Sequence, residues 1–374
     1  MNIFNELKSE SLIPAVVILA FLMVVGFVGN LHVLFVYAFR VKPTNHRIYI
    51  IFLSIQDITA CTILIPLRIY IYNNLWTHSN VFTCKFGSFM MCLILTGSAF
   101  TLILVAIDRY RKICNPHGWQ IKRPIAKLLC FVVTLCACFC SWPTAALGEV
   151  KNISVNNKTI SMCSTIDGYL KYQLYHRIFM AVIFFGSFCI LVVLYVCILK
   201  STSTYHVKEK VNETKQCGSS CYVVNSSKEN LIPDGEGIVS IDEENKQDKV
   251  GRQTKLDNKN LTKCSTGQVV TQTSNESQQK QKRTRRITLA FTLITVFYFI
   301  SYIPFISLDI FLLHGLFTST SPTIDVFIAI HIVSSCVFIN STVNCFIYSC
   351  FDGRFREEIV MLYKKLCCRH QETV

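Results

Sequence analysis

The sequence has few charged residues for its length of 374 residues. Asp, Glu, Lys and Arg together make up 16% of it, whereas a typical soluble domain has about 25%. Hydrophobic residues make up 51%, and the segment between residues 201 and 281 is almost wholly polar. Without that segment the chain is too apolar to dissolve in water, so an ordinary soluble enzyme is excluded.

Several chemical signatures are also missing. The sequence contains no H-E-x-x-H or G-x-S-x-G motif, which argues against a metalloprotease or a serine hydrolase. Its 19 cysteines lie mostly inside apolar runs, without the paired C-x-x-C motifs of a metal site. The net charge of +14 is spread over short clusters, with no basic face rich in aromatic residues. We therefore expect neither an enzyme nor a nucleic-acid-binding protein.

The sequence does contain a series of long apolar runs. A transmembrane helix needs about 20 mostly apolar residues, and the first run is too long to be the apolar core of a signal peptide. Seven runs qualify, and they lie at Leu12–Phe39, Arg47–Tyr72, Phe82–Ile113, Ile125–Leu147, Tyr172–Leu199, Ile287–His314 and Thr323–Cys350. We predict an all-α membrane protein, built as a seven-transmembrane helix bundle.

The placement of Lys and Arg predicts how the bundle is oriented. Basic residues concentrate in the segments after the first, third, fifth and seventh runs, as expected of cytoplasmic segments. We therefore expect a multi-pass protein of the plasma membrane, with the N-terminus outside and the C-terminus in the cytoplasm. The segments are an N-terminus (1–11), helices 1 to 5 (12–200), a polar loop (201–281), helices 6 and 7 (282–350) and a tail (351–374). The loop is too polar to bury a core, so we predict that it is disordered.

The tail begins with an amphipathic pattern. Basic residues separate four apolar residues at helical spacing, which are Phe355, Ile359, Leu362 and Leu366. This pattern predicts a short eighth helix that lies on the lipid of the inner leaflet.

Two kinds of covalent modification are expected. Cys367 and Cys368 directly follow the predicted eighth helix, where cysteines are often palmitoylated. Asn152 and Asn157 begin N-x-Ser/Thr sequons between the fourth and fifth runs, on the side that we place outside the cell. We expect glycosylation at these two asparagines.

Polar and ionisable side chains interrupt the apolar runs, and such residues are functional candidates because burying them in lipid is costly. With their neighbours they form short motifs, which are Gly29-Asn30, Leu53-x-x-x-Asp57, Trp76 before Cys84, Asp108-Arg109-Tyr110 before Pro116, Pro304, Asn344-x-x-x-Tyr348 and Phe351-x-x-x-Phe355-Arg356. The ordered series resembles the fingerprint of the rhodopsin-like (class A) G-protein-coupled receptor family. The resemblance covers all seven runs in order.

The resemblance implies several residue roles. By the family pattern, Cys84 and Cys163 form a disulfide. A sodium ion is expected among five oxygen-bearing side chains, which are Asp57, Ser98, Asn340, Ser341 and Asn344; a hydrated polar network without an ion is the alternative. Coupling to a heterotrimeric G protein and switching are expected to use Asp108, Arg109, Tyr110, Tyr195, Tyr348, Tyr302 and Pro304.

The sequence departs from the family pattern at several positions. Tyr302 stands where the family has a tryptophan, and Cys345 and Ser187 stand where it has prolines. The acidic residue common at the foot of the sixth helix is replaced by a basic run at 282–286. Because proline kinks assist helix movement, a receptor-like protein that does not signal stays an alternative. A channel or transporter is a further alternative, although Asp57 alone is too little to line an ion path.

The predicted pocket constrains the ligand. Met91 occupies the position where amine receptors of this family carry an aspartate, and the seventh run has no lysine for a retinal Schiff base. The pocket residues are expected to be Arg68, Met91, Tyr302, Phe305, Asp309, His331 and Phe338. A polar mouth over an aromatic floor favours a short peptide, with lipids and other small molecules as the alternatives.

Overall fold

Seven long apolar helices dominate the computed structural model, which describes residues 12–74, 80–155, 158–166, 168–225, 266–318 and 324–371. Each is long and apolar enough to cross a membrane. Their membrane-spanning parts are Ile13–Phe39, Asn45–Asn73, Val81–Cys114, Arg123–Leu147, Lys171–Thr202, Arg283–Leu308 and Ala329–Phe351. The seven predicted spans are confirmed, with ends that differ by a few residues.

The second span is not a regular α-helix. After α2 (Ile13–Phe39) come α3 (Asn45–Thr59), the π-helical segment η2 (Ala60–Leu64) and α4 (Ile65–Asn73). Pro66 lies in the first turn of α4; it has no backbone N–H to donate to the preceding turn. Short π segments inside α-helices often occur at functional sites, and this one begins three residues after Asp57.

The third span is the most buried of the seven. It is α5 (Val81–Cys114), and 67% of its most apolar window is buried, against 28% for the first, fourth and fifth spans. The helix begins at Asn80, whose side chain accepts a 3.2 Å hydrogen bond from the Thr83 N–H, a common way to cap a helix. Helix α6 (Arg123–Leu147) packs against α5. Side chains on α5 therefore lie at the centre of the helix bundle.

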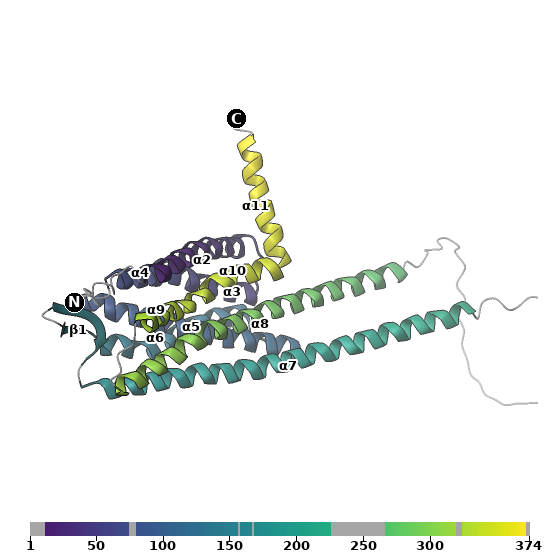
Figure 1. Cartoon of the computed structure of the whole chain (residues 1–374). Coiled ribbons are helices and arrows are strands. Elements are labelled where there is room, and N and C mark those ends of the chain that lie inside the picture. Colours follow the sequence, from purple (N-terminus) through teal and green to yellow (C-terminus); the bar gives the residue numbers. More distant parts are fainter. Residues whose placement is uncertain are drawn as a thin grey trace, which may run out of the picture. The chain divides into compact units, whose positions relative to one another are not determined.

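A β-hairpin connects the fourth and fifth spans. Strand β1 (Gly148–Val155) pairs antiparallel with β2 (Lys158–Thr165), with Val150 opposite Cys163. The hairpin lies at one end of the bundle, which we call the hairpin end (Figure 1). It adds a small sheet to the predicted all-α fold.

The fifth and sixth spans continue beyond the predicted membrane limits. Helix α7 covers Leu170–Asn225, and α8 covers Thr266–Thr318. Both ends of the segment 201–281, which we predicted to be disordered, are thus helical, and residues 226–265 lie outside the described part. Extending an existing helix is much easier than starting one, and the Lys, Glu and Gln residues at these ends favour helix. The sequence-based prediction considered only the lack of a core.

The seventh span ends in a sharp turn. It consists of α9 (Ile324–Ser335), the 3₁₀ turn η3 (Cys336–Phe338) and α10 (Ile339–Phe351). Helix α11 (Gly353–Gln371) follows directly and leaves α10 at an angle, at the end of the bundle opposite the hairpin (Figure 1). We call this the α11 end. The predicted eighth helix is confirmed.

Large apolar side chains cover the outside of the bundle. Phe21 is 65% exposed and Phe139 is 74% exposed, which would be unfavourable in water. The interior in turn holds polar and charged side chains, including Asp57 and Arg109 at 3% and 4% exposure. This reversal is expected where lipid is the solvent, so the chain is a multi-pass membrane protein.

Candidate functional site

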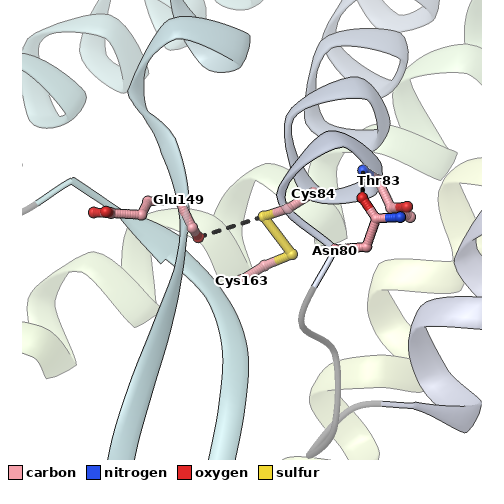
Figure 2. Close-up of a disulfide and its surroundings, with 5 residues drawn as sticks. All are labelled: Asn80, Thr83, Cys84, Glu149 and Cys163. Atoms are coloured by element: carbon pink, nitrogen blue, oxygen red, sulfur yellow. Dashed lines mark hydrogen bonds between the residues drawn. A yellow bond between two sulfur atoms is a disulfide. The ribbon is translucent and has the colours of Figure 1, made fainter.

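A disulfide joins the hairpin to the third span. Figure 2 shows the bond between Cys84, in the first turn of α5, and Cys163, in β2. Their Cα atoms are 5.7 Å apart, and the Cys84 sulfur lies 3.6 Å from the Glu149 carbonyl oxygen of β1. The pairing expected from the family pattern is confirmed. It holds both strands close to the start of α5.

A cavity of about 1060 Å³ opens beside this disulfide. Both disulfide cysteines contribute to its wall, together with side chains from α4, α5, α7, α8 and α9. Five of the seven predicted pocket residues line it, and they are Arg68, Met91, Phe305, His331 and Phe338. A volume of this size is sufficient for a small ligand or part of a peptide.

The other two predicted pocket residues, Tyr302 and Asp309, are not among the described residues that line the cavity. Tyr302 is absent from the cavity wall; it is only 3% exposed and packs on Tyr298 with ring centroids 4.6 Å apart. Its side chain is therefore part of the core. The side chain of Asp309 lies outside the described residues. His176 and Ser334 also line the cavity but were not predicted, because sequence spacing does not determine how far each helix is rotated toward the cavity.

Arg68 joins the second and seventh spans at the wall of the cavity. Its Nε donates to the Tyr72 hydroxyl over 3.3 Å, and its Nη2 lies 3.5 Å from the Ser334 Oγ. Its guanidinium carbon is 5.1 Å from the centre of the Tyr72 ring. Tyr72 and Ser334 are themselves 3.1 Å apart, and the Tyr72 hydroxyl donates to the His331 carbonyl. All of these polar partners of Arg68 are uncharged.

The five side chains of the expected sodium site are buried, each 2–3% exposed. The Asn344 Nδ2 donates a 2.7 Å hydrogen bond to Asp57 Oδ2, and the Ser341 side chain lies close enough to Asp57 to stabilise its carboxylate. No hydrogen bond joins Ser98 or Asn340 to Asp57 among the described residues. Asn344 is therefore hydrogen-bonded to Asp57, and Ser341 lies beside it.

The donor set of this cluster fits a sodium ion. The Oδ1 atoms of Asn340 and Asn344 are buried without a hydrogen-bond partner, and unsatisfied oxygens of this kind can bind a hard cation. No group of three or more His, Cys, Asp and Glu side chains suited to a metal occurs in the described part of the chain. One carboxylate with amide and hydroxyl oxygens suits sodium better than zinc.

Three side chains hold Asp108 at the α11 end. Its carboxylate accepts hydrogen bonds from Lys112 at 2.6 Å, from Asn45 at 2.9 Å and from Arg109 at 3.3 Å. Asn45 also donates to the Ile121 carbonyl at 2.6 Å, which ties the second span to the loop after α5. The sequence analysis expected Arg109 beside Asp108 but did not identify Lys112 or Asn45 as partners. A lysine four residues after an aspartate lies on the same helix face, so Lys112 could have been found.

Arg109 is buried and only partly satisfied. It is 4% exposed, its Nε has no hydrogen-bond partner, and its guanidinium carbon is 5.7 Å from the Phe291 ring centre on α8. Tyr195 accepts a 3.3 Å bond from Thr295, while the Tyr348 hydroxyl has no partner. Neither of these two tyrosines bonds to Arg109 in this arrangement.

Two further residues of the predicted switch lie in the third and sixth spans. Tyr110 follows Arg109 on α5 and packs against the core, and Pro304 lies inside α8. Other predictions fall on residues that the structure does not describe. Asn157 and Trp76 lie outside the described residues, and so do the side chains of Asn152, Cys367 and Cys368.

A second polar cluster lies where α10 meets α11. Asp352 is 7% exposed; it accepts a 2.5 Å hydrogen bond from the Tyr37 hydroxyl of α2 and a 3.0 Å bond from the Arg354 N–H. Arg283, in the basic run at the foot of the sixth span, lies within range of the Asp352 charge but forms no ion pair with it. The Asp352 carboxylate therefore connects the first span to the start of α11 by hydrogen bonds.

Comparisons with known proteins agree with this arrangement. The family described as 7 transmembrane receptor (rhodopsin family) matches residues 29–348. Neuropeptide Y receptor type 1 of Xenopus laevis is 27% identical over 54% of this chain and 58% of its own length. Neuropeptide Y receptor type 4 of Rattus norvegicus is 34% identical over 33% of each chain. The C3a anaphylatoxin chemotactic receptor of Oncorhynchus mykiss is 28% identical over 40% of this chain and 41% of its own.

The family match spans every helix of the bundle, from Gly29 in the first span to Tyr348 in the seventh. The alignments to individual relatives are shorter and leave at least two fifths of each relative unmatched. With the disulfide, the cavity and the buried Asp57 and Arg109 in place, the chain belongs to the rhodopsin family of seven-transmembrane receptors.

Proposed function

We propose that this chain is a cell-surface receptor that converts the binding of an extracellular ligand into activation of a heterotrimeric G protein. One structural relationship carries the proposal. A ligand-sized cavity lies at the hairpin end, the partly satisfied Arg109 lies toward the α11 end, and the buried Asp57 cluster lies in the core of the same bundle. The family membership supports the same function.

The hairpin end faces the outside of the cell in this proposal. Its disulfide supports that orientation, because disulfides persist on the oxidising side of the membrane. The basic residues of the α11 end support it as well, because such residues concentrate in cytoplasmic segments. Helix α11 then lies against the lipid of the inner leaflet, which makes membrane lipids a further partner.

The ligand is a short peptide. The relatives named as neuropeptide Y receptors support this class, although each is matched over less than two thirds of its length. The cavity wall supports it too, because charged and polar side chains such as Arg68 and Gln173 stand among apolar ones. The ligand shifts the balance between two packings of the helices only to the extent that it binds one packing more tightly.

Arg109 and the buried Asp57 cluster set the balance between the two packings. In the resting packing, Asp108 holds Arg109, and a sodium ion among the Asp57 oxygens would stabilise the closed core. In the active packing the foot of the sixth span moves away about Pro304. Arg109 then meets the G protein, with Tyr195 and Tyr348 available to support it.

The test is signalling in cells, measured with dissociation reporters for each G-protein class. The wild-type chain is compared with Arg109→Ala and with Lys127→Ala, an exposed basic residue near the same end, at equal surface expression. A signal from the wild type and Lys127→Ala that Arg109→Ala lacks would support the proposal. Equal signals from all three chains would contradict it.

A receptor-like protein that does not signal is the second candidate. It is favoured by Cys345 and Ser187, which replace family prolines, and by Tyr302, which stands where the family has a tryptophan and packs in the core. In that case every reporter would stay silent, including in cells exposed to a ligand that binds the purified chain. Binding and signalling therefore have to be measured separately.

A further inference from the structure

Arg68 is a half-buried cation that has no counter-ion in the described part of the chain. Its polar contacts are the hydroxyls of Tyr72 and Ser334, at 3.3 and 3.5 Å, and no ion pair joins it to an acidic side chain that the structure describes. A guanidinium has five N–H donors, and these two long bonds occupy only two of them. Placing such a charge in a partly apolar site is costly unless a partner compensates for it.

The cavity wall, as far as the structure describes it, carries no negative charge that could act as this partner. Among the described residues that line it there is no Asp or Glu, whereas Arg68, Arg177 and His176 are present. An apolar wall around a charge of one sign focuses its electrostatic field into the cavity. The cavity therefore attracts an anionic group toward Arg68.

Most of the remaining wall is apolar. Met91 and Leu95 come from α5, Phe305 from α8 and Phe338 from η3. These side chains cannot solvate a charge but can cover aliphatic or aromatic groups. A ligand that both pairs with Arg68 and covers the apolar wall therefore combines one anionic group with an apolar body.

We infer that the cavity binds a carboxylate attached to an apolar body, and that Arg68 receives the carboxylate. A guanidinium pairs with a carboxylate through two parallel hydrogen bonds, and one guanidinium balances one carboxylate charge. Phosphate groups are usually bound by several arginines. Arg177, the other arginine of the described wall, already has an interaction of its own, so Arg68 is left as a single guanidinium, which fits a carboxylate better. The free C-terminus of a peptide with an apolar last residue and the head of a fatty acid share this chemistry.

This inference rests on the proposed function only in that it takes the cavity as the ligand site. Binding of the carboxylate does not depend on coupling to a G protein. It is therefore measured on the purified full-length chain in detergent, by thermal unfolding, without any signalling partner. Signalling is recorded separately.

The probes are two matched pairs. The first is a pool of tetrapeptides ending in Leu, Phe or Met, with a free C-terminal carboxylate or with a C-terminal amide. The second is palmitate and palmitamide. We expect the carboxylate form of one pair to raise the unfolding temperature at concentrations where its amide has no effect, and the pair that does so identifies the source of the carboxylate.

Three variants locate the carboxylate. In Arg68→Gln the concentration for half-maximal stabilisation should rise about 10- to 100-fold, as expected for loss of a charged hydrogen-bonded pair. Arg68→Lys, which keeps the charge, should recover part of the affinity. Lys171→Gln removes an exposed cation of α7 that does not line the cavity and should behave as the wild type.

Each result decides the inference. Equal stabilisation by acid and amide, stabilisation by neither pair, or full affinity in a folded Arg68→Gln chain would overturn it. If Arg68→Gln does not fold in the absence of a probe, Arg68→Lys is compared with the wild type instead, and equal affinity of these two chains for the carboxylate probe would overturn the inference. A carboxylate that stabilises the chain but activates no G protein would leave this inference standing, and the signalling function would then be decided by the comparison of the wild type with Arg109→Ala.

Discussion

The side-chain amide of Asn344 donates a 2.7 Å hydrogen bond to the carboxylate of Asp57, across 287 residues of sequence. This bond connects the second span, just before its π-helical segment, to the seventh span, just after its 3₁₀ turn. Both irregular segments lie next to the Asp57 cluster. A change in the charge or the ligand of Asp57 would therefore act where both helices already depart from regular geometry.

The first prediction concerns sodium. In the purified chain, NaCl should stabilise the fold relative to choline chloride by about 1 to 3 kcal/mol when sodium exceeds its Kd by roughly 10- to 100-fold. Asp57→Asn should lose this difference because the amide cannot supply the carboxylate charge. Thermal unfolding in the two salts measures it.

Ser54→Ala is the matched control for this measurement. Ser54 is a buried polar residue of the same helix, and its hydroxyl donates to the Ile50 carbonyl, one turn earlier. It should keep the full sodium effect. A sodium effect that survives in Asp57→Asn would show that the ion, if bound, is elsewhere.

The second prediction concerns the carboxylate that holds Arg109. Asp108→Asn removes the charge that Lys112 and Arg109 share. Removing one partner of a buried ion pair commonly costs about 3 to 5 kcal/mol. If even a third of that cost falls on the resting packing alone, the equilibrium between the resting and active packings shifts about tenfold toward the active one. Basal G-protein activation should rise, as measured with dissociation reporters at equal surface expression.

Lys112→Gln separates the two cations. Lys112 makes the shorter contact with Asp108, but it is partly exposed, whereas Arg109 is buried. We expect Lys112→Gln to leave basal activation close to the wild type, because a partly exposed pair contributes little. A larger rise with Lys112→Gln than with Asp108→Asn would mean that Lys112 controls the switch.

The third prediction concerns the cluster between α10 and α11. Tyr37→Phe removes the hydroxyl that donates to the buried Asp352 and should lower the free energy of unfolding by about 1.5 to 3 kcal/mol, the range for bonds to charged groups. Tyr49→Phe is the control, because the Tyr49 hydroxyl is also buried but has no hydrogen-bond partner. Equal losses in the two variants would indicate that packing, rather than the bond to Asp352, is responsible.

The fourth prediction concerns close packing of the first and seventh spans. A Cβ at Gly29 would collide with the Cys345 side chain, whereas a Cβ at Gly186 would meet nothing within 4 Å. Gly29→Ala should therefore destabilise the chain by about 1 to 3 kcal/mol, and Gly186→Ala should be neutral or slightly stabilising. Cys345→Ala should rescue part of the Gly29→Ala loss, and the absence of any rescue would argue against this contact.

Much of the fold was predictable because it depends on local properties. Runs of apolar residues of sufficient length define the seven spans whatever their packing, and the ordered motifs led to the disulfide and to the Asp57 cluster. The hairpin at 148–165 and the π segment at 60–64 were not predicted, because their backbone geometry depends on neighbouring elements. The helical ends of the segment 201–281 were missed because only its inability to form a core was considered.

Contacts across the bundle were the hardest to predict. Tyr302 was assigned to the pocket from its position in a motif, but its ring packs on Tyr298 in the core. The bonds of Asn45 to Asp108 and of Tyr37 to Asp352 span 63 and 315 residues. Contacts at such separations depend on the rotation of each helix about its axis, which one sequence pattern does not determine.

The most direct test of the central claim uses the purified full-length chain in lipid vesicles with each class of heterotrimeric G protein. Nucleotide exchange on the G protein is measured for the wild type, Asp108→Asn and Arg109→Ala, with folding checked by thermal unfolding. A receptor of this family should accelerate exchange on at least one class, more strongly with Asp108→Asn and not at all with Arg109→Ala. Exchange that is identical for all three folded chains and for empty vesicles, on every class, would contradict a G-protein-coupled function.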